Sequence, residues 1–452
     1  MNEAYISFFS FFRNEEDILS EQIIRDLDRL VDKIIRNIEM QGKNNILYSY
    51  RNKSPVSEFV NYIIAYAIKL QASDIHLEPQ EKFLQIRYRI DGKLSLQYKA
   101  VSKITNYVIS YLKLISSLDI AEKRIPQDGK FIFSEKNIDI RISTIPILFG
   151  EKIVLRLLGN KENLLSLQQM NFSIENLINF KRMIQASSGL IVITGPVNSG
   201  KSTLLYASLN FLNKVDTNII TIEDPVELNI EGVNQMQVNL KAGFDFSIAL
   251  RASLRQDPDI VMVGEIRDEI VAKQAVSAAL MGHLVLTTLH TKNALGVPAR
   301  LIDMGVSPML LSIALLGMTS QRLVRRLCPY CKEKYKPSSN SLEALILGKD
   351  FYTGMDLFKD RGCEYCHYTG FLGQIALQEV LNPTEQMRSL ISKVDVDINF
   401  KRLVMVSGFK NLIDDAKQKI LLGMTTAQEV WKALNGVYQI EKISDDFATS
   451  SK

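Results

Sequence analysis

The fold of this chain is decided by the stretch Gly195-Pro196-Val197-Asn198-Ser199-Gly200-Lys201-Ser202-Thr203, which fits the pattern G-x-x-x-x-G-K-[ST]. An apolar run at residues 190–194 precedes it, and a helical pattern at residues 201–212 follows it. In that context the glycines let the backbone wrap around phosphate, and the amino end of the helix adds positive potential. We therefore predict that the chain binds a nucleoside triphosphate, with Lys201 on the β- and γ-phosphates and the Ser202 hydroxyl on Mg²⁺.

The sequence around this loop alternates between short apolar runs and helical patterns. Residues 218–222, 260–263 and 284–287 have the continuous apolar character of buried parallel strands. Residues 270–280 form another helical pattern. Alternation of this kind is typical of a three-layer α/β domain, which we place at residues 171–327.

Two carboxylates stand at the ends of predicted strands. Glu265 follows residues 260–263, and Gly264 stands where many phosphate-loop proteins carry an aspartate, so Glu265 would serve both metal and water. Glu223 follows residues 218–222. Acids at such turns are often only solvated, but two acid-ended strands after one phosphate loop favour a catalytic role. The candidate catalytic residues are Glu265, Glu223 and Lys201, and the candidate Mg²⁺ ligands are Ser202 and Glu265.

The chain before residue 171 is predicted to be a helical extension at residues 1–55, an α+β domain at residues 56–158 and a linker at residues 159–170. Residues 84–90 alternate strictly between apolar and polar and are followed by Asp-Gly, which predicts a hairpin. Residues 138–142 alternate in the same way. Because alternate residues of a strand share a face, this pattern sets a group of basic side chains apart from the apolar ones: Arg87, Arg89 and Arg141.

The four cysteines occur in two C-x₂-C pairs, Cys328 with Cys331 and Cys363 with Cys366. Four thiolates from two such pairs suit tetrahedral Zn²⁺, although the 31 residues between the pairs exceed the spacing of ordinary zinc ribbons. A site of this kind is structural because no ligand position is vacant. The predicted carboxy-terminal segments are a zinc-binding segment at residues 328–370, a helical part at residues 371–439 and a tail at residues 440–452.

The composition is that of an ordinary folded protein. The chain has 54 basic and 50 acidic side chains, a net charge of +4 and 46% apolar residues, which excludes wholesale disorder. No apolar run approaches the roughly 18 residues that span a bilayer. So small a net charge gives no argument for nucleic acid. Four cysteines in 452 residues exclude a disulfide scaffold and favour a reducing compartment.

Taken together, the motifs resemble those of the secretion ATPases of type II secretion and type IV pilus assembly, the GspE/PilB-like motors. Besides the phosphate loop, residues 221–227 are similar to the family's Asp box, residues 250–268 to its Walker B segment and residues 282–291 to its His box. Further stretches are similar to motifs of the family's amino-terminal domain, namely residues 72–79, 89–92, 126–129 and 150–156. The resemblance covers about residues 56–436.

The resemblance implies a RecA-like ATPase domain preceded by a smaller α+β (PAS-like) domain, assembled as a homo-hexamer with ATP at the subunit boundaries. It implies an ATP-hydrolysing motor at the cytoplasmic face of the inner membrane that powers assembly of a type IV pilus or a type II secretion pseudopilus. The implied partners are an inner-membrane platform protein and the cytoplasmic domain of a membrane-anchored assembly protein. The chain would be cytoplasmic and held at the membrane through these partners, and no nucleic acid is expected.

The resemblance also implies roles for single residues. It matches Glu265 to the Walker B acid and Glu223 to the Asp-box glutamate, without deciding which of them activates water. The four-cysteine insertion of the family's assembly motors strengthens the expectation of Zn²⁺. The residues implied in sensing the γ-phosphate or stabilising its transfer are His283, His290, Arg87, Arg89, Arg141, Arg156 and Arg267.

The sequence departs from the family pattern at several positions. Val197-Asn198 replaces the usual Thr-Gly of the loop, and asparagine is the non-glycine residue best able to adopt a positive φ. Lys130 and Gln374 stand where arginines are usual, and residues 269–271 lack the usual Glu-Thr. These departures leave open a nucleotide-binding but weakly hydrolytic assembly scaffold. The motifs are also compatible with a competence or DNA-uptake pseudopilus motor and with a RecA-like nucleic-acid motor.

Two further groups of residues suggest surfaces. Four phenylalanines within residues 8–12 either pack in a core or dock onto a membrane-anchored partner. A basic run forms either a solvated face or a contact with an anionic membrane surface; it consists of Arg322, Arg325, Arg326, Lys332, Lys334 and Lys336.

Overall fold

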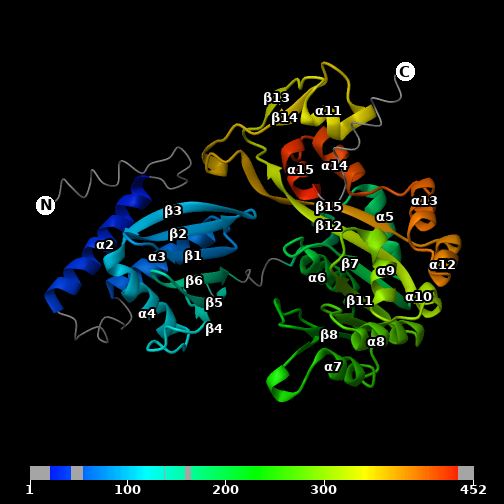
Figure 1. Ribbon diagram of the computed structural model, residues 1–452, viewed down its shortest axis with the longest axis horizontal. Helices are drawn as coiled ribbons and strands as arrows, with labels where there is room; N and C mark the ends of the chain where they lie inside the picture. Colours follow the sequence, from blue (N-terminus) through cyan, green and yellow to red (C-terminus); the bar gives the residue numbers. More distant parts are fainter. Residues whose placement is uncertain (1–20, 42–53, 137, 158–163, 436–452) are drawn as a thin grey trace. The chain divides into compact units, whose positions relative to one another are not determined.

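The computed structural model describes residues 21–41, 54–136, 138–157 and 164–435, and the chain divides into two compact units, residues 1–160 and 161–452 (Figure 1). The division falls within the segment predicted as a linker. The predicted tail at residues 440–452 and the phenylalanines at residues 8–12 lie outside the described residues.

The first unit is an antiparallel six-stranded sheet in the order β3-β2-β1-β6-β5-β4. The strands are β1 (Asp74–Pro79), β2 (Phe83–Ile90), β3 (Lys93–Val101), β4 (Gln127–Phe133), β5 (Ile138–Ile147) and β6 (Gly150–Leu157). The helices are α2 (Glu21–Gln41), α3 (Pro55–Lys69), the short η2 (Ser102–Ile104) and α4 (Thr105–Ile115). The predicted hairpin is confirmed as β2 and β3, which pair antiparallel.

Helix α2 belongs to the core of this unit instead of forming a separate extension. Leu27, Val31 and Ile34 are buried in the same apolar cluster as Phe59 and Ile63 of α3. The extension predicted at residues 1–55 is thus corrected for α2, because its apolar stripe is covered by α3 and the sheet. The opposite face of the sheet carries the polar side chains of the alternating strands.

The second unit contains a seven-stranded sheet in the order β15-β12-β7-β11-β10-β8-β9. All neighbours are parallel except β15, which runs antiparallel to β12. The strands are β7 (Gly189–Thr194), β8 (Ile219–Glu223), β9 (Asn234–Gln237), β10 (Ile260–Val263), β11 (Leu284–Leu289), β12 (Leu315–Leu327) and β15 (Phe371–Leu381). The predicted buried strands around the loop are confirmed.

Helices cover both faces of this sheet, as Figure 1 shows, so the unit has the predicted three-layer α/β architecture, and the sheet extends beyond residue 327 to include β15. One apolar cluster lies under η3 (Leu167–Met170), α5 (Ile174–Ile184) and α6 (Lys201–Leu212). The other lies under α7 (Phe246–Ser253), α8 (Glu269–Leu280), η5 (Ala294–Gly296), α9 (Val297–Asp303), α10 (Pro308–Ala314), α12 (Glu385–Ser392) and α13 (Ile398–Val406). The turn η4 (Leu240–Ala242) follows β9.

The carboxy-terminal part is a strand followed by helices. The helical prediction for residues 371–439 is wrong for β15, because pairing with β12 and burial on both sides outweigh local helical patterning. After α12 and α13 the chain continues with α14 (Leu412–Leu421) and α15 (Ala427–Leu434).

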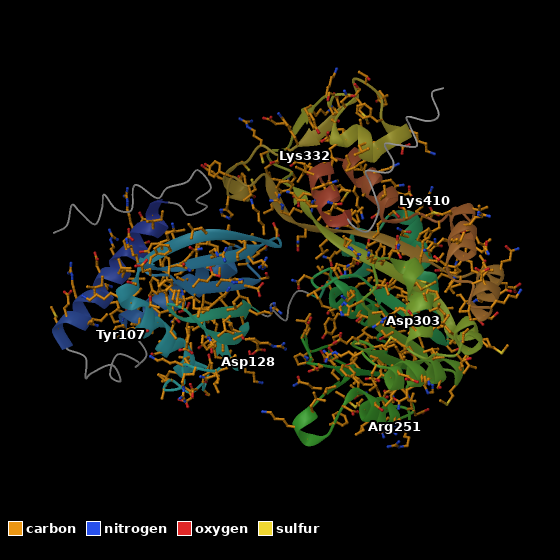
Figure 2. All side chains as sticks on the ribbon, in the orientation of Figure 1. Tyr107, Asp128, Arg251, Asp303, Lys332 and Lys410 are labelled. Carbon is orange, nitrogen blue, oxygen red and sulfur yellow. The ribbon has the colours of Figure 1, made fainter. Side chains whose placement is uncertain are left out.

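The segment between the cysteine pairs packs on α14 and α15 through its own apolar cluster. It comprises β13 (Glu333–Tyr335), α11 (Leu342–Leu347), η6 (Gly348–Asp350), β14 (Leu357–Lys359) and η7 (Glu364–Cys366). Lys332, labelled in Figure 2, donates a 2.8 Å hydrogen bond from Nζ to the carbonyl oxygen of Gly423, which ties this segment to the turn before α15.

A buried carboxylate organises the polar face of the first unit. Arg87 donates to both oxygens of Glu78 at 2.7 and 2.8 Å, and Lys152 Nζ lies 2.8 Å from Glu78 Oε1. Burial would raise the pKa of Glu78, but hydrogen bonds from Arg87 and Lys152 outweigh it and lower the pKa to about 2. The ionised form of Glu78 therefore stabilises the fold.

We expect Glu78→Gln to lower the free energy of unfolding at pH 7 by about 1–3 kcal/mol, because it weakens charge-assisted hydrogen bonds. Since the folded pKa lies below the usual 4.5, this stabilisation is present above pH 4.5 and is lost as the pH falls towards 2. The change in the free energy of unfolding is measured by urea unfolding, with amide hydrogen exchange in β1 as the probe. The exposed Glu81→Gln is the control. A cost of Glu78→Gln that is equal at pH 7 and pH 3 would contradict the stabilising role of the ionised carboxylate.

Candidate active site

The phosphate loop connects β7 to α6 at the carboxyl edge of the parallel strands. Gly195, Asn198 and Gly200 have φ values of +151°, +62° and +84°. The structure confirms that Asn198 takes a positive φ in place of glycine. The main chain curls between the strand and the amino end of α6, which is the backbone geometry that phosphate-binding loops use.

Lys201 begins α6 and folds back over the loop. Its Nζ donates hydrogen bonds to the carbonyl oxygens of Gly195 and Pro196, each at 2.9 Å. Burial lowers the pKa of Lys201, and the negative charge of Glu265 opposes that shift. The loop lysine and the acid after β10 lie at the same edge of the sheet, because β7 and β10 both run parallel to β11 between them.

Glu265 lies in a cluster of charged side chains where the parallel strands end. Its carboxylate pairs with Nε and Nη2 of Arg267, and Nε2 of His290 lies 3.4 Å from its Oε2. Arg267 also reaches Asp224, with Nη1 3.3 Å from Oδ2. The structure thus brings together Glu265, Arg267 and His290, which the sequence predicted, and adds Asp224, which it did not single out.

Glu223, the last residue of β8, is buried, with a relative exposure of 4%. Its carboxylate accepts hydrogen bonds from the hydroxyls of Tyr206 and Thr221 (2.6 Å) and from the amide of Gln235 (3.1 Å). The Tyr206 hydroxyl in turn accepts the backbone N–H of Glu227 at 3.0 Å. In this structure the Glu223 carboxylate oxygens are engaged by protein donors and tie α6 to the end of β8, and the role of Glu223 in metal or water chemistry stays a prediction.

The two predicted phosphate-sensing histidines, His283 and His290, lie at opposite ends of strand β11. Strand β11 runs between them, and a strand of this length spans roughly 20 Å. His290 is beside Glu265, whereas His283 lies at the amino end of β11, where Nδ1 is 3.0 Å from the carbonyl oxygen of Ala278. The structure therefore does not bring His283 to the phosphate loop of its own chain.

Three of the four predicted arginines of the first unit, namely Arg87, Arg89 and Arg156, are held by acids of β1. Arg156 Nε donates to Asp74 Oδ1 at 2.9 Å, and Arg89 Nε lies 3.7 Å from Asp74 Oδ2. Arg87 binds Glu78 as described above, and Arg141 of β5 stands opposite Arg156 of β6 in register. These four residues belong to the first unit and the phosphate loop to the second, so their action on a nucleotide stays a prediction.

The four cysteine sulfurs all lie within 4.8 Å of one another. The Sγ separations are 3.9 Å for Cys328–Cys363, 3.8 Å for Cys331–Cys366 and 3.7 Å for Cys363–Cys366. They exceed a disulfide bond of about 2.05 Å and match the roughly 3.8 Å edge of a tetrahedron with Zn–S bonds near 2.3 Å. Because Cys328 follows β12 and Cys366 precedes β15, the pairs close the base of the connection between these strands, which explains their long spacing.

The predicted basic run does not form one surface. Arg322 is 6% exposed and donates to the carbonyl oxygens of Gln321 and Lys292. Arg325 pairs with Glu429 at 2.7 Å and lies over a phenyl ring. Both alternatives, a solvated face and a contact with an anionic membrane surface, are therefore wrong for Arg322 and Arg325, because these side chains of β12 are directed into the protein.

Buried amides lie beneath the phosphate loop, and the motifs of the sequence did not single them out. Gln321 of β12 has no exposed surface, and its Nε2 donates to the carbonyl oxygen of Ser199 at 2.6 Å. The signal was present as a polar run, residues 319–321, inside an otherwise buried strand. Within this run the Gln321 amide has side-chain hydrogen bonds, whereas the hydroxyls of Thr319 and Ser320 have no partner among the described residues.

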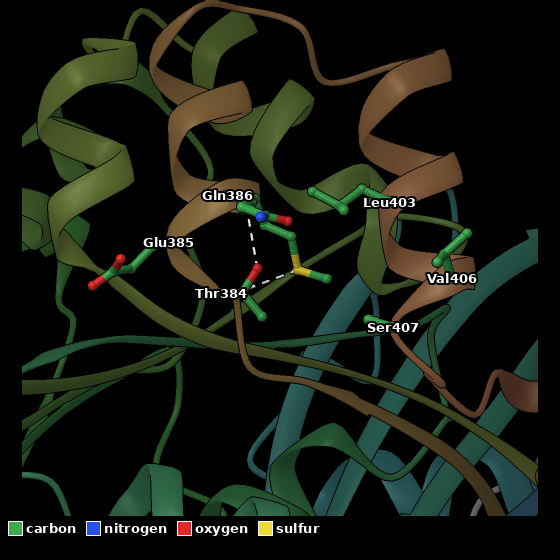
Figure 3. Close-up of a pocket in the computed structure, with 7 residues that line it drawn as sticks. Thr384, Glu385, Gln386, Leu403, Val406 and Ser407 are labelled. Carbon is green, nitrogen blue, oxygen red and sulfur yellow. Dashed lines mark hydrogen bonds between the residues drawn. The ribbon is translucent and has the colours of Figure 1, made fainter.

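A pocket of about 480 Å³ lies between α12 and α13, away from the elements that carry the site (Figure 3). Its lining consists of Thr384, Glu385, Gln386, Met387, Leu403, Val406 and Ser407. No member of the lining is a cation or belongs to the phosphate loop, so we assign this pocket no role in phosphate chemistry.

A phosphate loop between a parallel strand and a helix, with an acid after another parallel strand of the same sheet, defines a P-loop nucleotide-binding protein. The fold is similar to that of the ATPase DotB from Legionella pneumophila, with a TM-score of 0.62 and 21% identity over 84% of this chain and 96% of that one. It is also similar to the pilus retraction motor PilT with bound ADP, with a TM-score of 0.57 and 24% identity over 82% of this chain and 96% of that one.

The chain belongs to the family described as type II/IV secretion system protein, whose profile matches residues 49–432. It is 42% identical over 424 residues to the putative type II secretion system protein E of Escherichia coli K12, covering 93% of this chain and 85% of that protein. It is 44% identical over 386 residues to the type II secretion system protein E of Pseudomonas aeruginosa, covering 85% and 76%.

The family membership supports ATPase activity. The type IV pilus assembly ATPase PilB of Thermus thermophilus is 43% identical over 381 residues, which cover 84% of this chain and 43% of PilB. The predicted resemblance to secretion and pilus-assembly ATPases is thereby confirmed. Among the helices of the described residues, none is both long and apolar enough to cross a bilayer.

We expect Tyr206→Phe to lower the free energy of unfolding by about 1–3 kcal/mol, because it removes a donor from the buried Glu223 carboxylate and an acceptor from the turn after β8. Urea unfolding of the second unit measures the change. Tyr352→Phe, at a tyrosine 66% exposed, is the matched control and should change nothing. Equal stability of the two variants would show that the Tyr206–Glu223 contact does not hold α6.

Proposed function

We propose that this protein hydrolyses ATP with Mg²⁺ and uses the energy to assemble the filament of a type II secretion system or a type IV pilus. The observation that carries the proposal is the juxtaposition of the phosphate loop, Lys201 and Glu265 at one edge of the sheet. Family membership supports the substrate and the process, because the named relatives are secretion and pilus-assembly proteins.

The nucleotide-binding residues are those of the loop: Gly195, Pro196, Val197, Asn198, Ser199, Gly200, Lys201, Ser202 and Thr203. Lys201 neutralises the phosphates when its ammonium group leaves the loop carbonyls. The Ser202 hydroxyl and the Glu265 carboxylate fit Mg²⁺, because hard oxygen ligands are what this ion takes, and bound Mg²⁺ neutralises charge on the phosphates.

Glu265 is the group that orients and deprotonates the attacking water. Its neighbours support the role, since Arg267 and His290 hold the carboxylate from two sides. Glu223 is a positioning residue in this scheme, because its hydrogen bonds fix α6 and the turn that carries Asp224.

The arginine face of the first unit would supply cations to the phosphoryl transition state, from the same chain or from a neighbour. Glu78 and Asp74 support this role by holding Arg87, Arg89 and Arg156 in a fixed array. If nucleotide binding favours one position of this face, hydrolysis changes the relative position of the two units. We propose a homo-hexamer as the working form, cytoplasmic and held at the inner membrane by a platform protein and a membrane-anchored assembly protein.

We also propose that the four cysteines bind one structural Zn²⁺. The donor set and its sulfur separations fit a closed tetrahedral site. The ion would clamp the ends of β12 and β15 where the chain leaves and re-enters the sheet.

We expect Lys201→Ala and Glu265→Gln each to reduce ATP turnover at least about a hundredfold, because one removes a phosphate cation and the other the group that activates water. ATP turnover is measured as the rate at which the full chain releases inorganic phosphate from ATP. Glu269→Gln, an exposed glutamate near Glu265 in sequence, is the matched control and should keep turnover. Undiminished turnover in both site variants would remove the assignment, and ATP binding without turnover in the unmodified protein would favour the weakly hydrolytic assembly scaffold.

We expect one zinc ion per chain by elemental analysis, and loss of the ion in Cys331→Ser, with the midpoint of thermal unfolding lowered by about 5 °C or more. The variant leaves three thiolates, too few to close the tetrahedron. Tyr330→Phe, at the exposed neighbouring residue, is the control and should retain zinc. Protein free of zinc but equally stable would contradict the structural role.

A further inference from the structure

Both glycines that define the phosphate loop lie against one residue of β12. A Cβ atom at Gly195 would come within 2.6 Å of the backbone carbonyl oxygen of Gln321, and a Cβ atom at Gly200 within 2.5 Å of its side-chain Nε2. Real Cβ atoms do not make contacts that short, so any larger residue at either position would collide with Gln321. The loop therefore packs directly on Gln321, although Ser199 and Gln321 are 122 residues apart in sequence. The surface under the loop is therefore a polar amide.

That amide makes one directional contact with the loop. Gln321 Nε2 donates to the carbonyl oxygen of Ser199 at 2.6 Å, and Gln321 is fully buried. The peptide unit between Ser199 and Gly200 is planar and trans, so its C=O and N–H point in opposite directions. Holding the carbonyl towards β12 turns the N–H of Gly200 away from the sheet, towards the concave side of the loop where phosphate binds.

A second amide fixes the direction of the first. A carbonyl oxygen can only accept, so Gln321 must present its NH₂ group to Ser199, which leaves Oε1 for another donor. That donor is Gln378, whose Nε2 lies 3.1 Å from Gln321 Oε1 and which stands opposite Gln321 in register. Gln378 is also fully buried.

The backbone of Gln378 is fixed from both sides of the strand. Its N–H donates to Asp415 of α14 at 2.8 Å, and its carbonyl oxygen accepts the amide of Asn176 at 3.0 Å. Asp415 is itself paired with Lys419 at 2.6 Å within α14. The chain of contacts thus runs from α14 through β15 and β12 to the phosphate loop.

We propose that Gln321 and Gln378 are positioning residues for ATP hydrolysis, which preset the phosphate-binding face of the loop by fixing the peptide between Ser199 and Gly200. The proposal rests on the nucleotide function proposed above. Neither side chain touches the nucleotide, and both act through the orientation of a backbone N–H. Such a group binds phosphate in the ground state and in the transition state alike, so its misplacement weakens binding more than it slows the chemical step.

The test is steady-state kinetics and ADP binding by the full chain. Gln321→Met keeps the volume and removes both hydrogen bonds. We expect KM for ATP and Kd for ADP to rise by about five- to a hundredfold, as for one buried hydrogen bond left unmade, with kcat within about threefold of the unmodified protein. Thr319→Val, at a fully buried neighbour on β12 whose hydroxyl has no partner in the described part of the chain, is the matched control and should leave all three constants unchanged.

Gln378→Leu should shift KM and Kd in the same direction, and the double variant should be no weaker than Gln321→Met alone, because both act through one contact. If Gln321→Met does not fold, Gln378→Leu decides the question alone. Unchanged KM and Kd would overturn the positioning role. A fall in kcat with KM unchanged would overturn it too, because that result reports only a loss of active molecules. An unmodified protein that neither binds ADP nor hydrolyses ATP would instead overturn the proposed function itself.

Discussion

The arrangement of the second unit depends on one geometric constraint: parallel strands in register place their carboxyl ends at one edge of the sheet. Thr194 of β7 stands opposite Leu289 of β11, and Val263 of β10 opposite Thr287. The residues that follow these strands therefore meet, although they are far apart in sequence. Lys201 and Glu265 lie at the same edge of the sheet for this reason, and His283, at the other end of β11, does not join them. Crevices at the carboxyl ends of such strands are the usual ligand sites of open α/β sheets.

The sheet combines an apolar centre with a polar side. Strands β7 and β10 contribute buried aliphatic residues, whereas β12 and β15 bury Gln321, Gln378 and Glu379. Burying such groups costs free energy unless each finds partners. Glu379 accepts the backbone N–H groups of Ala294 at 2.7 Å and Leu412 at 3.1 Å, so it joins the loop after the His box to the start of α14. The polar side thus connects α14 to the loop after β11 and to the phosphate loop.

Much of the second unit could be predicted from its sequence, because local pattern and tertiary environment agree there. Strands made of continuous apolar residues are buried on both faces, here between two layers of helices. The positions of β7, β10 and β11 were therefore predictable from their apolar runs. The positive φ of Asn198 followed from the chemistry of asparagine, and the clustering of the cysteines followed from their pairing. The polar alternation of β2 likewise predicted which face of that strand is buried.

The remaining features depend on contacts that no local pattern specifies. Glu223 is the last residue of β8 and Glu265 follows β10 by two residues, and Glu223 is buried against Tyr206, Thr221 and Gln235. Arg322 belongs to a basic run by sequence, but within β12 it is buried and donates to the carbonyl oxygens of Gln321 and Lys292. Residues 371–381 form strand β15 because they pair with the side of β12 that β7 leaves free.

The loop and Glu265 are expected to enclose one triphosphate, and a crystal structure of the full chain with Mg²⁺ and a non-hydrolysable ATP analogue tests this most directly. We predict the phosphates in the curl from Gly195 to Thr203, Lys201 Nζ moved from the loop carbonyls onto them, and the Glu265 carboxylate facing the metal and the terminal phosphate. Phosphates bound elsewhere, or a Glu265 carboxylate still turned away from them with the loop filled, would contradict the proposed site.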